Sequence, residues 1–321
     1  MSEKWMLENL IKGQNKISFS ANGLINWVRA TSILCDEQEL FSTDLLKNNS
    51  KFVQPHDFND EQKKHIFKNF FFSMYEYTHL ARLVHENIYP YDILTAALNS
   101  CYKSIIFAVK SMKLSNAESR YVSIEQLINF YQTELINKDI LPIPFSIGFK
   151  DLTKKNTKDK IKSLKNNNSY NNNDYPKTKE MSWGASITFL NGTRDYIAER
   201  TEERLLNSCQ FYEKKILNFR TKDAQSIRDK ELALKSVNFL AQLHRIYSKV
   251  RSDEIIYIAY GGIKPEKLKQ FILDLKKIAR IFQIISSRYI SHKCSSEEWD
   301  HFIQDFEKNA AISLKVQHLK W

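Results

Sequence analysis

The stretch "ILTAALNSCYKSIIFAV", from Ile93 to Val109, decides the fold class. On a helical wheel it is apolar on nearly all sides, and a helix of that kind is buried at the centre of a bundle. Pro90 breaks the chain just before it, and Asp92 is predicted to cap the helix. We therefore predict a mostly α protein, a multi-helix bundle around a helix from Ile93 to about Met112.

Helical patterns continue towards the C-terminus. Helices are predicted from about Arg194 to Arg220 and from about Asp229 to Val250. Pro265 is well placed to open another helix, because its fixed φ suits the first helical position. Ser295 and Glu298 fit the capping box that would open the last helix.

Two short runs break the helical rhythm. Apolar residues alternate with others in the ranges Ile143–Phe149 and Trp183–Phe189, and a period of two indicates strands with one buried face. Between these runs lies a Lys/Asn-rich segment poor in apolar residues, 150–180, which favours a flexible loop. We predict a single helical domain over 1–321, with a two-stranded β-hairpin insertion at 143–190 that carries this loop.

The net charge of +11 favours a polyanionic partner. Much of it is concentrated in 150–180, where nine lysines face four acids. The remainder of the chain is only mildly basic, and a solvated surface explains that part equally well. A lysine-rich loop would add salt-sensitive attraction to nucleic acid without reading its sequence.

Several classes of protein are disfavoured. Only Gly261 and Gly262 lie close together among seven glycines, so neither common phosphate-binding loop is present. The four cysteines form no CxxC pair, and no HExxH motif occurs. No apolar run approaches the length of a membrane span. We expect a cytoplasmic protein without cofactor, bound metal or membrane association.

The stretch "RSDEIIYIAYGG", from Arg251 to Gly262, is the first candidate site. On the wheel of the helix before it, His244 and Arg251 share the apolar side with Tyr247. A buried arginine needs an anionic or carbonyl partner, which Asp253 could supply. The functional interpretation is a phosphate-binding pocket with His244 as acid or base. The structural alternative is a helix-terminal arginine making capping and salt-bridge contacts.

Two weaker candidates follow. Arg288 and His292, at i, i+4 spacing, share one face near a helix end, where cations are favourable without any function. His79, Arg82 and Glu86 form a polar stripe with His85 nearby. Arg82 and Glu86 fit an ordinary ion pair, and two histidines with one glutamate are weak evidence for a metal.

Two stretches together resemble the uncharacterised bacterial YaaC-like family. They are "FFFSMYEYTHLARLVHENIYPYDILTAALNSCYKSIIFAV" (Phe70–Val109) and "IISSRYISHKCSSEEW" (Ile284–Trp299). The shared features are an aromatic-led helix, a Tyr-Pro break, an apolar helix, and an Arg-Tyr before a tryptophan-bearing helix. The resemblance implies an all-helical bacterial protein without an assigned reaction.

The Arg251 segment also resembles the HEPN superfamily, helical proteins that include RNases of toxin–antitoxin and phage-defence systems. Their signature is an arginine, often followed by a polar residue, then four to six residues and a histidine. Here Arg251, Ser252 and Asp253 begin similarly, but Tyr257 stands in the place of the histidine. In Arg288/His292 only three residues intervene. The resemblance implies a degenerate site or one that uses another base.

These observations lead to one expected function and one alternative. The expected function is RNA binding or metal-independent RNA cleavage in a bacterial defence or toxin system. Arg251 would contact the phosphate, His244 would serve as acid or base, and Asp253 and Tyr257 would complete the site. The alternative is a non-catalytic helical scaffold that binds a protein partner or forms a homo-oligomer.

Overall fold

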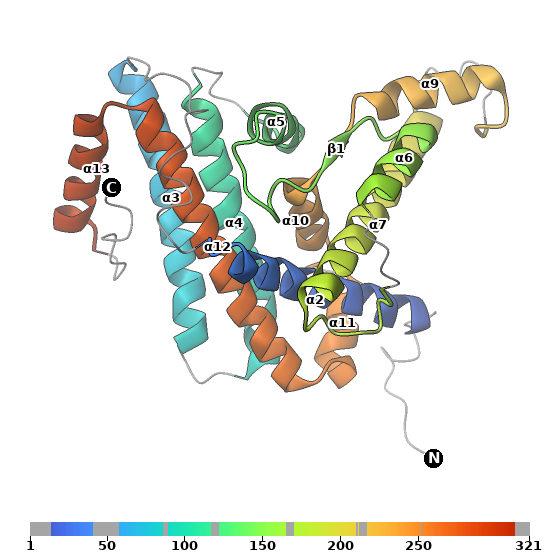
Figure 1. The fold of residues 1–321 in the computed structure, drawn as a ribbon, viewed down its shortest axis with the longest axis horizontal. Helices are drawn as coiled ribbons and strands as arrows, with labels where there is room; N and C mark the ends of the chain where they lie inside the picture. Colours follow the sequence, from blue (N-terminus) through green and yellow to red (C-terminus); the bar gives the residue numbers. More distant parts are fainter. Residues whose placement is uncertain are drawn as a thin grey trace.

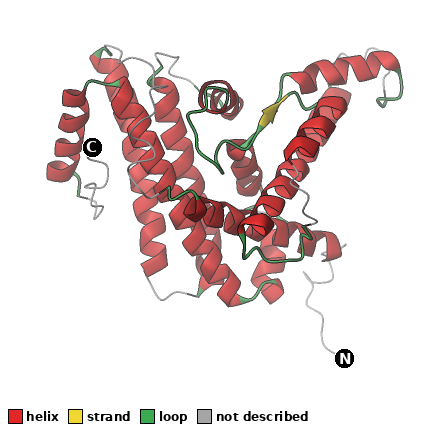
Figure 2. Cartoon of the chain, in the orientation of Figure 1, coloured by secondary structure: helices red, strands yellow, loops and turns green. Residues whose placement is uncertain are grey.

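The computed structural model describes residues 14–40, 58–85, 89–116, 122–164, 170–209, 211, 217–250 and 252–311. These residues are mostly helical and include one two-stranded antiparallel sheet (Figure 2). The predicted class, a mostly α multi-helix bundle with a small two-stranded sheet, is confirmed.

Three long helices form the bundle in the left half of Figure 1. They are α3 (Asp60–His85), α4 (Pro90–Leu114) and α12 (Pro265–Lys293), and α4 packs against both of the others. The short α13 (Ser296–Asn309) follows α12 and lies at the outer edge. Burial of α4 on several sides agrees with its apolar wheel.

The helix starts were predicted in part. Pro265 occupies the first turn of α12, and Ser295 and Glu298 form both hydrogen bonds of the capping box of α13, so these two starts are confirmed. Asp92 lies in the first turn of α4 rather than at its cap, which is Tyr89. The expected cap is wrong because Pro90, two residues before Asp92, already occupies the first helical position.

The helix α2 (Gln14–Glu37) joins the bundle to the rest of the fold. It packs against α12 on one side and against α7 (Lys179–Leu206) on the other. An ion pair of 3.1 Å between Arg29 and the buried Asp274 ties α2 to α12. With α6 (Lys154–Leu164) and α9 (Lys222–Ala233), α7 forms the arm in the right half of Figure 1, which has smaller apolar clusters of its own.

The sheet is not the predicted hairpin. The strand β1 (Phe149–Lys150) pairs antiparallel with β2 (Ser236–Val237), a distant segment. Gly148 permits this approach, since a Cβ there would lie 2.8 Å from the Val237 carbonyl oxygen. The first strand was therefore expected close to its true place, but its partner could not be read from local alternation.

The predicted second strand, Trp183–Phe189, lies inside α7. The alternation is misleading because α7 packs against α2 on one side and against α6 and α9 on others. Buried residues such as Ala185, Ile187 and Phe189 therefore do not follow a single helical stripe. The same helix continues past Gly192 and ends at Leu206, short of the expected Arg220.

The segment 150–180 is more ordered than predicted. Residues 154–164 form α6, and the Asn-rich part docks on α2. The side-chain amide of Asn26 donates to the carbonyl oxygens of Asn172 and Asp174, and that of Asn172 donates to the Phe19 carbonyl oxygen. The flexible-loop prediction is wrong for these residues, because amide side chains satisfy backbone groups. Residues 165–169 lie outside the described residues.

The helix predicted over Asp229–Val250 is broken. After α9 the chain forms β2 and then α10 (Phe239–Ser248). Asn238 causes the break because its side chain accepts a hydrogen bond from the Ala241 amide and so caps α10. Asparagine favours such caps over helix interiors.

Short helical segments complete the described fold. The helix α5 (Ile124–Phe130) continues into a π-helical turn, η1 (Tyr131–Ile136). The helix α11 (Asp253–Tyr257) continues into η2 (Ile258–Gly262), where Gly261 adopts a φ of 83°. None of the helices in the described ranges combines the length and apolar character that a bilayer crossing requires.

Candidate functional site

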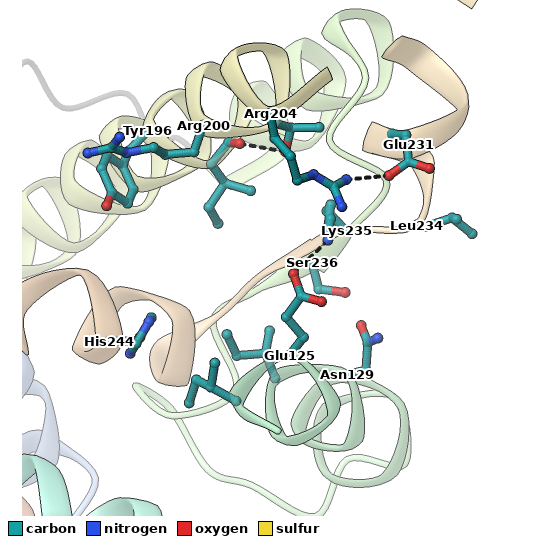
Figure 3. A pocket seen from close by; sticks show the side chains of 14 residues that line it. Glu125, Asn129, Tyr196, Arg200, Arg204, Glu231, Leu234, Lys235, Ser236 and His244 are labelled. Atoms are coloured by element: carbon teal, nitrogen blue, oxygen red, sulfur yellow. Dashed lines mark hydrogen bonds and ion pairs between the residues drawn. The ribbon is translucent and has the colours of Figure 1, made fainter. Parts of the chain in front are cut away.

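A pocket of about 490 Å³ lies between α5, α7 and the chain from α9 through β2 to α10 (Figure 3). That volume falls within the roughly 300–1,000 Å³ range of small-molecule sites. Its apolar lining comes from Ile124 and Ile128 of α5, Ile197 of α7, and Leu234. Polar and charged side chains make up the rest of the lining, so the pocket suits a ligand with an apolar body and an anionic group.

Local caps fix the walls of the pocket. Ser123 and Gln126 form a capping box that starts α5. Asn238 caps α10 and also donates to the Ile128 carbonyl oxygen, which links α10 to α5. Pairing with β1 holds β2 between them. The pocket is therefore built on capped helices and a strand rather than on loops alone.

His244 of α10 lines this pocket. Its Nδ1 lies 2.9 Å from the hydroxyl oxygen of Tyr102, and no described residue contacts Nε2 by a hydrogen bond. The Tyr102 ring stacks on Tyr247 at 3.9 Å between centroids and 7° between planes. When Nδ1 carries the proton, it donates a hydrogen bond to the Tyr102 hydroxyl oxygen. Nε2 then keeps a lone pair for a substrate.

The protonation states suit that role. Burial lowers the pKa of His244 below its usual value, so the imidazole is neutral at pH 7. Burial, with a smaller contribution from Tyr247, raises the pKa of Tyr102 to about 12. A neutral imidazole beside a protonated phenol can take up a proton from a bound hydroxyl.

Cations outnumber carboxylates in the lining. The lining contains three cationic side chains, Arg200, Arg204 and Lys235, and two carboxylates, Glu125 and Glu231. Arg204 pairs with Glu231 at 2.6 Å and Lys235 with Glu125 at 2.9 Å (Figure 3). The Lys235 ammonium lowers the pKa of Glu125 through its hydrogen bond and its charge. Exposed pairs of this kind exchange partners at little cost, so both cations can turn to a ligand anion.

Arg245, the neighbour of His244, lies in an alternating stack of rings and cations. Its guanidinium carbon is 5.2 Å from the centre of the Phe189 ring and 5.5 Å from that of Tyr196. The Arg200 guanidinium lies 5.5 Å from the same Tyr196 ring. Arg245 also donates to the Thr193 hydroxyl, and burial lowers its pKa. The stack places a guanidinium and an aromatic ring, Arg200 and Tyr196, at the pocket wall.

Ser236 contributes a buried hydroxyl to the lining. The residue is 4% exposed, and its Oγ has no hydrogen-bond partner among the described residues. Leaving a buried hydroxyl unsatisfied costs about 1–3 kcal/mol. The site therefore contains a polar group that a ligand could satisfy.

The stretch predicted as the first site supplies no described residue to this pocket. Arg251 lies outside the described residues. Asp253 is an exposed residue in the first turn of α11, and the Tyr257 hydroxyl donates to Ser18 at 3.2 Å. Of the three residues predicted for that site that the structure describes, only His244 lines the pocket.

A different cluster forms in that stretch. Glu254 accepts hydrogen bonds from Ser20 and Ser252, at 2.7 and 2.6 Å, and pairs with Lys249. Burial raises the pKa of Glu254, but these hydrogen bonds and the Lys249 charge outweigh it and hold the pKa at about 2. Because a carboxylate with so low a pKa is a weak base and is already paired with Lys249, we assign the cluster to tying α2 to α11 and not to activating Ser20 as a nucleophile.

The second predicted pair lies elsewhere. Arg288 is buried in α12 at 3% exposure, whereas His292, near the end of that helix, is exposed. Burial and the Arg288 charge lower the pKa of His292. Neither side chain lines the pocket.

The third predicted stripe does not converge on a metal site in the described residues. His79 lies 3.8 Å from Glu76 and edge-on to Tyr75, and Glu86 is outside the described residues. No group of three or more metal-ligating side chains occurs in the part of the chain that the structure describes.

Sequence reasoning missed most of the pocket. Tyr196, Arg200 and Arg204 follow one another at intervals of four residues, and this spacing on one helix face was the available signal. Lys235 and Ser236 gave no local signal, because they reach the pocket through the pairing of β2 with β1.

Comparison of the chain with family models, with curated proteins and with solved structures finds no match in any of the three.

Proposed function

We propose that the protein binds RNA at this pocket and cleaves it without a metal ion, with His244 as the general base. The observation that carries the proposal is the position of His244 in the same pocket lining as Arg200, Arg204 and Lys235, at a site where burial lowers the pKa of the imidazole. A base that is neutral at pH 7, in one pocket with cations that attract phosphate, supplies the groups that RNA transesterification needs.

The reaction would proceed by internal attack. His244 Nε2 takes the proton of the ribose 2′-hydroxyl, the 2′ oxygen bonds to the adjacent phosphorus, and the phosphorus–O5′ bond breaks. Water protonates the leaving O5′, giving a 2′,3′-cyclic phosphate and a 5′-hydroxyl. Arg200 and Lys235 would offset the charge that develops on the phosphoryl oxygens.

The charge of the whole chain supports the binding step. The net charge is +11, and α6 carries five lysines against one aspartate. Such a surface attracts any polyanion over about a Debye length, roughly 10 Å at 0.1 M salt. The preference for RNA over other polyanions would then come from the pocket rather than from this general attraction.

The test compares RNA with DNA of the same sequence, at low salt and in EDTA. The wild-type protein should cleave the RNA and leave the DNA intact, since DNA lacks the 2′-hydroxyl. His244→Asn should lower the cleavage rate by about a hundredfold or more. His79→Asn changes a histidine that does not line the pocket, and it should retain the wild-type rate.

The outcomes separate binding from cleavage. Cleavage by the His244→Asn variant at the wild-type rate would overturn the catalytic role of His244. If the wild-type protein and the variants bound RNA but none of them cleaved it, the cleavage proposal would be overturned and the RNA-binding proposal would stand. Failure to bind RNA or DNA at low salt would overturn the function as a whole and favour the scaffold alternative. Arg251→Ala belongs in the same series, because the sequence predicts a phosphate contact there.

The scaffold alternative predicts an exposed apolar patch. The large apolar side chains exposed in the described residues belong to different elements, for example Phe19 of α2, Tyr75 of α3 and Leu273 of α12. Because no observation assembles them into one surface, the pocket supports RNA binding better.

A further inference from the structure

The pocket has two chemically different sides. Ile124, Ile128 and Ile197 form an apolar wall, while Arg200 and Lys235 stand in the charged part of the lining. A free phosphate would use the cations and leave the isoleucines unused. A purely apolar ligand would leave the cations unused. A nucleotide has both a flat base and a phosphate, and its size suits a pocket of about 490 Å³.

The stacked side chains favour a planar ring. Arg200 lies over the Tyr196 ring and is 64% exposed, so the guanidinium is open to solvent. Guanidinium planes and aromatic rings are the platforms on which unpaired bases stack, at about 1–3 kcal/mol per base. Arg245 supports Tyr196 from the α10 side and limits its freedom to move.

The unsatisfied hydroxyl of Ser236 supplies polar recognition. Its Oγ lacks a partner among the described residues, while the residue itself lines the pocket (Figure 3). Because this Oγ is buried, the side chain would have to turn about χ1 to meet a ligand in the pocket. The donor and acceptor groups on the edge of a nucleobase could then satisfy the hydroxyl.

We propose that the pocket holds one unpaired nucleotide, with its base between Arg200 and the isoleucine wall, its base edge on Ser236, and its phosphate near Lys235. The inference rests on the proposed RNA function and specifies its substrate class as single-stranded rather than duplex RNA, because a paired base cannot enter such a pocket.

The first experiment uses mononucleotides and the wild-type protein. AMP and UMP are titrated separately by calorimetry, with ribose 5-phosphate and inorganic phosphate as base-free probes. At least one nucleotide should bind tenfold or more tightly than ribose 5-phosphate. The inference would be overturned if the base-free probes bound as tightly as the nucleotides, or if neither nucleotide bound.

The second experiment uses two buried serines. Ser236→Ala and Ser186→Ala each remove a hydroxyl that has no partner among the described residues, in side chains of equal exposure, and only Ser236 lines the pocket. Both variants should fold with an unchanged or raised Tm, because an unsatisfied group is removed. Only Ser236→Ala should weaken nucleotide binding, by about tenfold. Equal nucleotide affinity in the two variants would overturn the contact to Ser236.

A third comparison separates this inference from the proposed function. Single-stranded RNA should bind more tightly than a blunt RNA duplex at the same salt concentration. Equal binding of both would overturn the nucleotide pocket and leave RNA binding standing. Nucleotide binding without RNA binding would support the pocket and overturn the RNA function.

Discussion

His244 depends on a neighbour that is distant in sequence. Tyr102 of α4 holds its Nδ1 at 2.9 Å, and Tyr247, one helical turn beyond His244, stacks on the Tyr102 ring. A hydrogen bond at one ring nitrogen selects the tautomer and so decides whether the other nitrogen can act as a base. The chemistry of one histidine is therefore set by a tyrosine on another helix.

Tyr102→Phe should lower RNA cleavage by about tenfold and leave stability nearly unchanged, because the stacked ring stays while the hydroxyl that orients His244 is lost. Tyr247→Phe is the matched control, since its hydroxyl makes no hydrogen bond with a described residue, and it should cleave at the wild-type rate. Single-turnover assays would measure both rates. A similar loss in both variants would contradict an orienting role for Tyr102.

The lowered pKa of His244 predicts a pH dependence. The imidazole should remain an effective base down to pH values below 6.5 and lose activity only as pH falls through its lowered folded-state pKa. The same shift makes the folded state less stable at acidic pH, since the unfolded state binds the proton more readily. NMR titration of the histidine resonances, with His244→Asn for assignment, would measure the pKa. A value above 6.5 would contradict the effect of burial.

Glu254 predicts a separate loss of stability in acid. Its folded-state pKa of about 2 lies below the ordinary 4.5, so the stabilisation is complete above pH 4.5 and is lost as pH falls towards 2. Glu254→Gln should lower the free energy of unfolding by about 2 kcal/mol at pH 7. The substitution should also flatten the dependence of the free energy of unfolding on pH below pH 4.5. Urea titrations at pH 7 and pH 3 would measure both effects.

Glu203→Gln is the control for Glu254. Glu203 forms an exposed pair with Arg200, and such pairs contribute about 0–1 kcal/mol. The control should therefore change stability little at either pH. Equal destabilisation by both substitutions would contradict the assignment of Glu254 as the buried tie between α2 and α11.

At the scale of elements, α7 is the helix that connects the site with the scaffold. Tyr196, Ile197 and Arg200 of α7 line the pocket, and α2 packs along the same helix. The Asn-rich segment closes over it, with Tyr170 against Gly184. Glycine in the interior of a helix is unfavourable by roughly 0.5–1 kcal/mol, so it needs a reason in packing.

The two interior glycines of α7 should respond oppositely to alanine. At Gly184 a Cβ would lie 2.4 Å from the Tyr170 Cβ, so Gly184→Ala should displace that segment and destabilise the fold by about 1–3 kcal/mol. At Gly192 a Cβ would lie 3.3 Å from the tip of Arg245, which can shift. Gly192→Ala should therefore gain about 0.5 kcal/mol from helix propensity. Denaturant midpoints would rank the two variants, and the reverse ranking would contradict this packing.

At the scale of the whole molecule, the bundle of α3, α4 and α12 lies apart from the arm of α6, α7 and α9 (Figure 1). The bundle belongs to the largest apolar cluster, whereas the arm has smaller ones. The pocket lies where α7 and α9 approach α5 and α10. A ligand in the pocket would therefore touch the arm through α7 and α9, and also α5 and α10, but none of the three bundle helices.

The arm should carry most of the salt-dependent attraction. Lys158 and Lys162 of α6 are exposed at i, i+4 spacing, and replacing both with glutamine should reduce the slope of log affinity against log salt by up to about 1.4 for single-stranded RNA. Lys64 and Lys68 of α3 have the same spacing and exposure on the distant bundle, and their double glutamine variant should leave the slope unchanged. Filter binding at several salt concentrations would decide. Equal slopes for both variants would contradict a role for the arm.

Local signals predicted much of the fold but little of the site. Pro265 and the Ser295–Glu298 box act over a few residues, so the starts of α12 and α13 could be predicted. The strand predicted at Trp183–Phe189 failed because the burial of α7 depends on which helices surround it. Among the predicted site residues that the structure describes, only His244 lies in the pocket, since wheel positions give the face of a helix but not its neighbour.

The sequence by itself determined the helical class, the buried character of α4, and the helix starts that proline and capping residues define, because these depend on backbone geometry and on contacts within one or two turns. Only the tertiary structure decided the pairing of β1 with β2, the docking of the Asn-rich segment, and the meeting of Arg200, Lys235 and His244. These features join residues far apart in the chain, and packing between elements selects them rather than local preference.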